Sequence, residues 1–155
     1  FQGDMVPRVT YMGDPYSCAF SGKALTFFSS RNLASPELLE QRTIEERIDS
    51  VFYSDEYAAA IVRNTNGEYG SRLEVYKKDG THVLSKEFNF EYTHADFDGD
   101  LIILYNEDSC RIYNMSGTEK FDATFDFPVS RIRKGRFPGT LVVTGPQQMQ
   151  ELKLR

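Results

Sequence analysis

Short runs of alternating apolar and polar residues, separated by turn residues, make up most of the chain. The run 121–127 alternates strictly, with Phe or Ala at every second position and Asp or Thr between them. Phe88, Phe90 and Tyr92 alternate with polar residues in the same way. A period of two is typical of a strand with one buried face. The sequence therefore predicts an all-β fold built from many short antiparallel strands.

Turn residues lie between these runs. The pairs are Asn66-Gly67, Asp79-Gly80, Asp98-Gly99 and Ser116-Gly117. These residue types tolerate the positive φ that tight hairpins require. The segment 35–40 departs from the pattern, because Ser35 is a helix N-cap residue and Pro36 suits the first helical position. It predicts one short helix near 35–40, inserted between two strands.

An internal repeat is the most informative feature of the chain. Residues 73–80 align with residues 110–117, at an offset of 37 residues from Tyr76 to Tyr113. Each block is followed by a strand that ends in Phe and is preceded by two further strand-like segments. A unit of four strands and about forty residues is typical of a propeller blade.

Weaker copies of the unit begin and end the chain, so we expect a β-propeller-like repeat domain over residues 8–155. The blade-like units lie at about 8–48, 49–91, 92–128 and 129–155. The last unit lacks its fourth strand, and a count of about four is at or below the smallest ring that propellers normally close. Residues 1–3, Phe-Gln-Gly, are predicted to be the remnant of an expression tag.

Composition narrows the classes of function. The 155 residues include 18 Lys and Arg against 23 Asp and Glu, a formal net charge of −5, with 12 Phe, 9 Tyr and no Trp. Aromatic residues favour β-structure, and the negative charge disfavours a nucleic-acid partner or direct contact with an anionic membrane. The longest apolar run, 58–62, is far shorter than the ~20 residues that cross a bilayer.

The two cysteines, Cys18 and Cys110, lie among apolar or β-type neighbours. Without a Cys-x-x-Cys pair they cannot form a closed zinc site by themselves. Free cysteine is among the most buried residue types, so we expect two buried free thiols rather than a disulfide. No cofactor is indicated.

Spaced carboxylates near residue 98 suggest a calcium site, because hard cations prefer oxygen ligands. The weak metal candidates are Asp96, Asp98, Asp100 and Glu107. The last of them lies where an EF-hand loop places its bidentate ligand, but Leu101 occupies the position that should be Gly. Residues 101–105 have the pattern of a strand leaving an Asp-Gly hairpin. We therefore favour the hairpin over the metal site.

No catalytic motif stands out. The chain has no Gly-x-Ser-x-Gly elbow, Walker motif, dinucleotide fingerprint or Gly-rich phosphate loop. His82 follows a turn and His94 lies in a predicted strand, and each is interpreted as a surface or satisfied strand residue rather than a general base. Paired carboxylates for glycoside hydrolysis are defined by their separation in space. A carbohydrate-active or other hydrolytic propeller with converging carboxylates is therefore the alternative function.

A basic cluster lies at residues 131–136, with Arg131 and Arg133 on either side of an apolar residue. This alternation favours a strand with a solvated face over a nucleic-acid site, since interleaved aromatic residues are missing. Tyr16 and Tyr69 are predicted at exposed loop tips, where Tyr provides contact area at low entropy cost. The two tyrosines and the two arginines form the predicted interaction surface.

The segments 51–57, 75–88 and 110–121 resemble the strand and turn sequences of an uncharacterised family of Gram-positive bacterial proteins. Members of that family have an N-terminal membrane anchor followed by an extracytoplasmic β-propeller-like domain. The similarity covers roughly Val9 to Leu154. It implies that this stretch is the C-terminal half of a longer propeller, extracytoplasmic and membrane-anchored in the full-length protein. The resemblance carries over no catalytic residue or ligand.

A repeated four-strand unit without a catalytic motif predicts a non-catalytic interaction scaffold, with an unknown protein or glycan as its partner. The ends of an incomplete ring expose unpaired backbone groups. A homodimer through exposed blade edges is therefore also predicted. A third alternative is a structural half-domain that completes a ring only with other blades.

Overall fold

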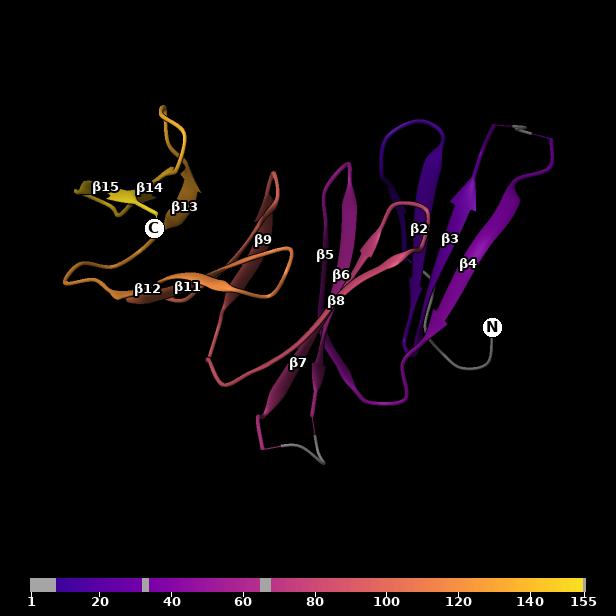
Figure 1. Cartoon of the computed structure of the whole chain (residues 1–155), viewed down its shortest axis with the longest axis horizontal. Helices are drawn as coiled ribbons and strands as arrows, with labels where there is room; N and C mark the ends of the chain where they lie inside the picture. Colours follow the sequence, from indigo (N-terminus) through magenta and orange to yellow (C-terminus); the bar gives the residue numbers. More distant parts are fainter. Residues whose placement is uncertain (1–7, 32–33, 65–67, 155) are drawn as a thin grey trace. The chain divides into compact units, whose positions relative to one another are not determined.

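The computed structural model describes residues 8–31, 34–64 and 68–154, which form strands and no helix (Figure 1). In chain order the strands are β1 (Arg8–Tyr11), β2 (Tyr16–Ser21), β3 (Ala24–Ser29), β4 (Glu37–Thr43), β5 (Ile48–Tyr53), β6 (Tyr57–Arg63), β7 (Ser71–Lys77), β8 (His82–Phe88), β9 (His94–Asp98), β10 (Leu101–Tyr105), β11 (Ser109–Asn114), β12 (Glu119–Thr124), β13 (Arg131–Lys134), β14 (Thr140–Thr144) and β15 (Met149–Lys153). The all-β prediction is confirmed. Within the described ranges no helix is long and apolar enough to cross a membrane. The predicted tag remnant and the Asn66-Gly67 turn lie outside the described residues.

The strands form four antiparallel sheets, and within each sheet the strands lie in sequence order. Sheet 1 contains β1–β4, sheet 2 contains β5–β8, sheet 3 contains β9–β12 and sheet 4 contains β13–β15. Short connections favour this arrangement, because an antiparallel neighbour can be reached through a tight turn. The prediction of four-stranded antiparallel units, with a last unit of three strands, is confirmed for the described residues.

The chain divides into two compact units, 1–89 and 90–155. In the first unit, sheets 1 and 2 share one core of buried side chains. Sheet 2 supplies small residues to this core, Ala58 and Ala60, beside the rings of Phe27 and Tyr76. The two ring centroids are 5.9 Å apart and the rings are tilted by 56°. Combining small and large side chains across facing positions is what lets two pleated surfaces pack closely.

The second unit has a core of its own, formed by sheets 3 and 4. The phenylalanines of the alternating run 121–127 contribute to it, as the pattern predicts, but β12 ends before the last two. Phe125 N–H donates to the carbonyl of Asp108 at 2.6 Å, outside the ladder of the sheet. Phe125 and Phe127 are both buried, so alternation of the side chains continues past the end of the strand.

The helix predicted near 35–40 is wrong. That segment enters β4, which pairs with β3 from Ser29 opposite Glu37 to Ala24 opposite Thr43. A helix of about six residues is only marginally stable in water, whereas strand pairing satisfies the outer backbone groups of β3. Leu38 is exposed on β4.

The repeat read from the sequence is also a repeat of backbone geometry. The pairing of the third with the fourth strand shifts by one residue in sheets 1, 2 and 3, between Phe27 and Phe28, between Val75 and Tyr76, and between Ile112 and Tyr113. Such a shift marks a β-bulge, which twists the strand locally. In sheets 2 and 3 the two shifts are again 37 residues apart.

The turns that follow these shifts also correspond. Lys77 N–H donates to the carbonyl of Thr81 at 2.8 Å, and Asn114 N–H donates to the carbonyl of Thr118 at 3.0 Å. The glycines of the two turns, Gly80 and Gly117, have φ of +90° and +82°. Positive φ is the reason that both turns require glycine at this place.

Candidate functional site

Two edge strands of the second unit, β9 and β13, line a pocket of about 340 Å³. Its lining residues are Asp96, Phe97, Asp98, Ile103, Arg131, Ile132, Arg133 and Lys134. We call this pocket the β9–β13 groove. It brings together two of the predicted metal candidates and both arginines of the predicted interaction surface, which were expected at separate sites.

Strand alternation explains the chemistry of the groove. On β13, Ile132 is buried while Arg131 and Arg133 are exposed, which confirms the predicted strand with a solvated face. On β9, Phe97 is buried between Asp96 and Asp98. Successive side chains point to opposite faces of a strand, so apolar side chains support the groove while the carboxylates and the two arginines line its opening. Lys134 borders the groove where β13 ends.

Both carboxylates of the groove accept hydrogen bonds from the backbone. Lys134 N–H donates to Asp98 Oδ2 at 2.5 Å, which joins β13 to β9. Phe97 N–H donates to Asp96 Oδ1 at 2.8 Å. Charge-assisted bonds of this kind are stronger than neutral ones. They hold both carboxylates in place and occupy one oxygen atom of each.

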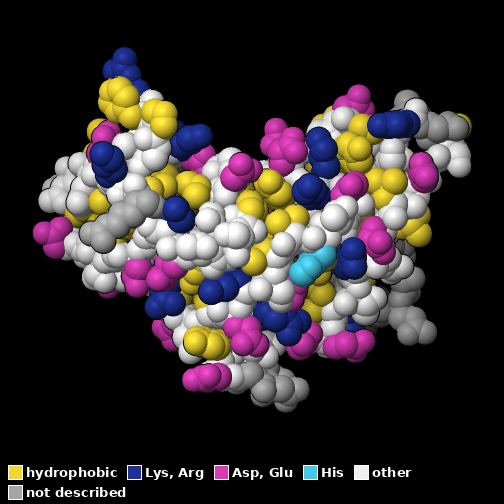
Figure 2. Space-filling view, in the orientation of Figure 1, with side chains coloured by type: hydrophobic (Ala, Val, Ile, Leu, Met, Phe, Trp, Pro, Cys, Tyr) yellow, Lys and Arg dark blue, Asp and Glu magenta, His cyan; other side chains and the backbone are white. Residues whose placement is uncertain are grey.

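The cationic side chains of the groove have no such anchors. Among the described residues, Arg131, Arg133 and Lys134 form no ion pair. Burial raises the pKa of the nearby Tyr105 hydroxyl. The charge of Asp96 raises this pKa further, and the charge of Arg131 lowers it. Elsewhere acidic and basic side chains are interspersed, as Figure 2 shows for one face. The groove therefore combines three unpaired cations with two anions that are already hydrogen-bonded.

The four predicted metal candidates do not converge. Asp98 pairs with Leu101 across a two-residue turn in which Gly99 has a φ of +57°, so the Asp-Gly hairpin is confirmed. Asp100 lies in that turn, whereas Glu107 lies in the turn at the other end of β10. Within the described ranges, no group of three or more His, Cys, Asp or Glu could hold a metal ion.

The two tyrosines of the predicted interaction surface lie in the first unit. Tyr69 is exposed, at 41%, just before β7. Tyr16 is half-buried and packs against the core, so its predicted place at an exposed loop tip is wrong. The turn before β2 is the reason, because Tyr16 N–H donates to the carbonyl of Gly13 and its own carbonyl accepts from Met12. The ammonium group of Lys78 lies 5.1 Å from the centre of the Tyr16 ring.

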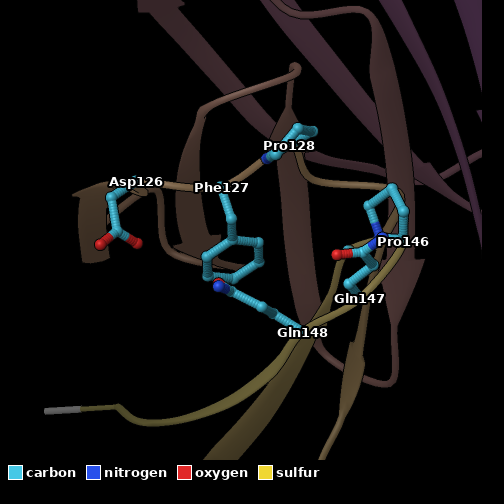
Figure 3. A pocket seen from close by; sticks show the side chains of 7 residues that line it. Asp126, Phe127, Pro128, Pro146, Gln147 and Gln148 are labelled. Carbon is cyan, nitrogen blue, oxygen red and sulfur yellow. The ribbon is translucent and has the colours of Figure 1, made fainter.

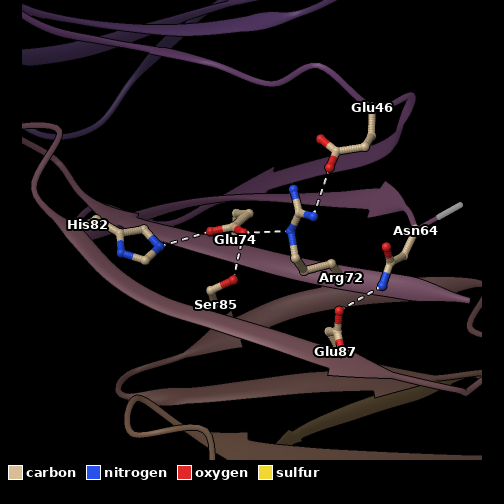
Figure 4. Close-up of polar contacts among 7 residues, drawn as sticks. All are labelled: Glu46, Asn64, Arg72, Glu74, His82, Ser85 and Glu87. Carbon is tan, nitrogen blue, oxygen red and sulfur yellow. Dashed lines mark hydrogen bonds and ion pairs between the residues drawn. The ribbon is translucent and has the colours of Figure 1, made fainter. Parts of the chain in front are cut away.

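A second polar cluster surrounds Glu74 on β7 and was not found from the sequence (Figure 4). Glu74 is only 8% exposed, and its carboxylate lies 2.7 Å from Arg72 Nε, 2.7 Å from Ser85 Oγ and 2.8 Å from His82 Nε2. Ser85 is the direct partner of Glu74 across the β7–β8 ladder. We call these four residues the Glu74 network.

The Glu74 network extends to the segment between sheets 1 and 2 of the same unit. Arg72 Nη1 donates to Glu46 Oε1 at 2.9 Å, which lowers the pKa of Glu46 and raises that of Arg72. Serine and histidine both bind the carboxylate here. In a catalytic triad the histidine lies between the serine and the acid, so this arrangement is a set of structural contacts around a buried charge.

Both histidines have partners. His82 binds Glu74. His94 stacks on Tyr105 with ring centroids 4.8 Å apart, and its Nδ1 lies 3.0 Å from Thr93 Oγ1. The interpretation of both as satisfied strand residues is confirmed.

One protein family matches nearly the whole chain. The family described as "Family of unknown function (DUF5711)" matches residues 1–154. The chain belongs to this family. No curated protein matches the sequence.

Solved structures show what the DUF5711 chain is similar to in fold. The computationally designed Ika4 protein has a TM-score of 0.60 and 8% identity, over 99% of this chain and 95% of Ika4. A functionally unknown protein from Desulfotomaculum acetoxidans has a TM-score of 0.59 and 11% identity, over 94% of this chain and 54% of that one. Kluyveromyces lactis Hsv2 has a TM-score of 0.54 and 10% identity, over 95% and 45%. The chain spans about half the length of the last two structures, and at these identities the similarity shows the fold alone.

The cysteines of the DUF5711 chain are buried and free, which confirms the prediction made for Cys18 and Cys110. Burial raises the pKa of each thiol to about 12. The thiolate is the reactive form of cysteine, so neither thiol is a nucleophile at neutral pH.

A further pocket of the DUF5711 chain, of about 330 Å³, lies between the turns 126–128 and 145–148 (Figure 3). Gly145 makes the close approach of these turns possible. A Cβ at this position would lie 2.5 Å from the carbonyl oxygen of Pro128 and 2.8 Å from Cδ2 of Phe127. Apart from Asp126 its lining is uncharged, and no motif in the sequence marks this pocket.

Proposed function

We propose that this DUF5711 chain is a non-catalytic, β-propeller-like interaction module that binds an acidic, extended segment of a partner protein in the β9–β13 groove. The observation that carries the proposal is the set of three cationic side chains, Arg131, Arg133 and Lys134, that line one groove without an ion pair in the described part of the chain. They stand out in a chain whose formal net charge is −5.

The propeller-like architecture is supported by the repeat. A series of blades requires consecutive antiparallel sheets, each in sequence order, and the four sheets meet this requirement. In sheets 2 and 3 a bulge and a turn also recur at an offset of 37 residues. Propeller blades surround a central channel. β9 and β13 are the first strands of their sheets and lie at sheet edges, which suits strands that line such a channel.

The chemistry of the groove favours an acidic peptide. Arginine side chains bind carboxylates with two parallel hydrogen bonds, which adds direction to the charge attraction. Phe97 N–H and Lys134 N–H on the edges of β9 and β13 already bind Asp96 and Asp98, so strand addition by an extended chain would use the remaining backbone groups of these edges. A peptide uses both properties, whereas a glycan uses only the first.

We also propose that the full-length protein is membrane-anchored and places this chain outside the cytoplasm. The support is the resemblance of its repeat segments to a family with that organisation. A cysteine at the exposed position Tyr69, labelled on intact cells that produce the full-length protein, tests it. Labelling by a membrane-impermeant maleimide is expected, and labelling only after lysis would contradict the proposed location.

Binding of a fluorescent octaglutamate peptide, followed by anisotropy, tests the proposed function. We expect the R131E/R133E variant to bind at least tenfold more weakly than the unchanged chain, and R136E, an exposed change outside the groove, to bind equally well. Affinity should fall with added salt, because the attraction is between charges. Equal binding by all three proteins would contradict the proposal. Tighter binding of a uronic-acid oligosaccharide than of the peptide would point to a glycan partner instead.

A hydrolytic function is the second candidate, and one observation favours it. Asp96 and Asp98 occupy alternate positions on β9 and line the same groove, so two carboxylates are available in one pocket. Turnover of glycan or ester substrates that is lost in both D96N and D98N would decide for an enzyme. No turnover with either the unchanged chain or the variants would decide against it.

A further inference from the structure

The outer edge of β15 differs from the corresponding edges in the other sheets. The third strands β3, β7 and β11 are each covered by a fourth strand, whereas β15 is the third strand of sheet 4 and its last one in the described residues. Figure 1 shows β15 at the margin of its sheet. Four of its five residues are exposed, and Met149 reaches 73%. Within the described residues, the outer edge of β15 is therefore unpaired.

The hydrogen bonds of β14 and β15 show which backbone groups face outward. Leu154 N–H donates to the carbonyl of Gly139 at 2.7 Å, and Gln148 accepts from Gly145 at 2.8 Å. In an antiparallel ladder, inward and outward groups alternate, so Gln150 and Leu152 face β14. The N–H and C=O groups of Met149, Glu151 and Lys153 face outward, where no other strand pairs with them within the described ranges.

We propose that this edge pairs with the same edge of a second copy of the chain, antiparallel and about a two-fold axis at Leu152. In this register Glu151 of each copy lies opposite Lys153 of the other. Both residues direct their backbone groups outward, so they form the hydrogen-bonded pairs that an antiparallel ladder needs. Leu152 lies opposite its own copy at the closely spaced, non-hydrogen-bonded position.

Charge selects this register over its neighbours. An axis at Glu151 would place two glutamates opposite each other, and an axis at Lys153 would place two lysines opposite each other. Like charges directly opposite are destabilising, whereas opposite charges attract. An axis at Gln150 would lose both ion pairs. The axis at Leu152 is the arrangement that satisfies backbone direction and charge together.

Packing agrees with this register. Leu152 is 9% exposed and belongs to the core of the second unit, so the partner's Leu152 would extend that core across the axis. The joined sheets would form one continuous six-stranded sheet. A two-fold contact uses the same edge on both copies and closes on itself, so the association stops at two. The inference is separate from the proposed function, because β15 contributes nothing to the β9–β13 groove.

Charge exchange tests the proposal, with the molar mass followed by light scattering after size-exclusion chromatography over a range of concentrations. The unchanged chain should give twice the monomer mass at high concentration. E151K and K153E should each weaken dimerisation at least tenfold, because each places like charges opposite each other twice. The E151K/K153E variant should restore the dimer, since every opposite pair then again carries opposite charges.

Two further measurements complete the test: circular dichroism with a control variant, and hydrogen exchange. Circular dichroism should show that all variants fold, and R136E, an exposed charge change outside β15, should leave the dimer unchanged. Hydrogen exchange at Glu151 and Lys153 should slow as concentration rises. Protection of these amides that does not depend on concentration, in a monomer, would show that another part of the protein covers the edge and would overturn the proposal. A dimer insensitive to both single changes would also overturn it.

Discussion

Glu74 and Arg111 occupy the same position in two consecutive sheets, 37 residues apart, and carry opposite charges. Their partners on the fourth strand are also 37 residues apart. Glu74 contacts His82, and Arg111 contacts the equivalent residue, Glu119. Glu74 also contacts Ser85, and Arg111 contacts its equivalent, Asp122. The distances from Arg111 Nε are 3.8 Å to Glu119 and 4.0 Å to Asp122. The repeat has therefore kept the arrangement and inverted its charge.

This inversion gives each third strand a preferred fourth strand. If β12 paired with β7, Glu74 would face Glu119 and Asp122 in place of His82 and Ser85. A partly buried carboxylate beside two others is strongly unfavourable. The inverted charges thus help to distinguish two repeats whose backbones are alike.

Replacing Glu74 with Ala should destabilise the protein by about 3 kcal/mol, the usual cost of breaking a buried, hydrogen-bonded ion pair. The matched control is E87A on the same pair of strands, since Glu87 is exposed and binds only Asn64 among the contacts described, at 2.8 Å. The control should change stability by less than about 0.5 kcal/mol. Urea unfolding measures both. Equal effects of the two changes would mean that the Glu74 network adds nothing to stability.

Gly80 should tolerate alanine far less well than Gly99. Both have positive φ, but a Cβ on Gly80 would clash with the side chain of Glu40 and lie 3.1 Å from Phe27 Cδ2, whereas nothing lies within 4 Å at Gly99. We expect G99A to cost about 1 kcal/mol for its backbone conformation, and G80A to cost at least about 2 kcal/mol more for overpacking. Thermal or urea unfolding distinguishes them. Similar losses would show that the turn of Gly80 can move away from sheet 1.

The thiols predict how stability depends on alkaline pH. Burial raises the pKa of Cys18 and Cys110 from 9.0 to about 12, so the folded protein holds these protons more strongly than the unfolded chain. This contribution is fully present below about pH 9 and is lost as the pH rises toward 12. Between pH 8.5 and 10.5, the unchanged protein should lose about 2 to 4 kcal/mol more than C18A/C110A.

Urea unfolding at several pH values measures this difference between the two proteins. Native thiols should also react with a disulfide reagent only after unfolding, because the thiolate is absent and the sulfur atoms are buried. Parallel pH profiles for the two proteins, or rapid reaction of the native thiols, would contradict the assignment.

Alternation predicted the strands well where the two faces of a strand differ. The strand at 101–105 was predicted with the bounds that the structure shows for β10, because the Asp98-Gly99 turn fixes its start. The segment 35–40 misled because Ser35 and Pro36 are genuine helix-start signals. Their local preference is small, and pairing along β3 outweighed it.

The site was predicted only in pieces. The sequence singled out Asp96, Asp98, Arg131 and Arg133, but their proximity depends on how sheet 4 packs on sheet 3 within the second unit. Glu74 was missed because it fits the alternation of apolar and polar residues along β7. That alternation is the same whether the glutamate side chain is exposed to solvent or buried among polar partners. An arginine two residues earlier and a serine opposite it in the ladder were the available signals.

We propose the β9–β13 groove as the binding face of the chain. The most direct test is a ¹⁵N–¹H NMR titration of the chain with an octaglutamate peptide. We predict that chemical-shift changes concentrate at residues 96–98 and 131–134 and disappear in R131E/R133E. An absence of saturable changes, or changes centred on other residues, would contradict the claim.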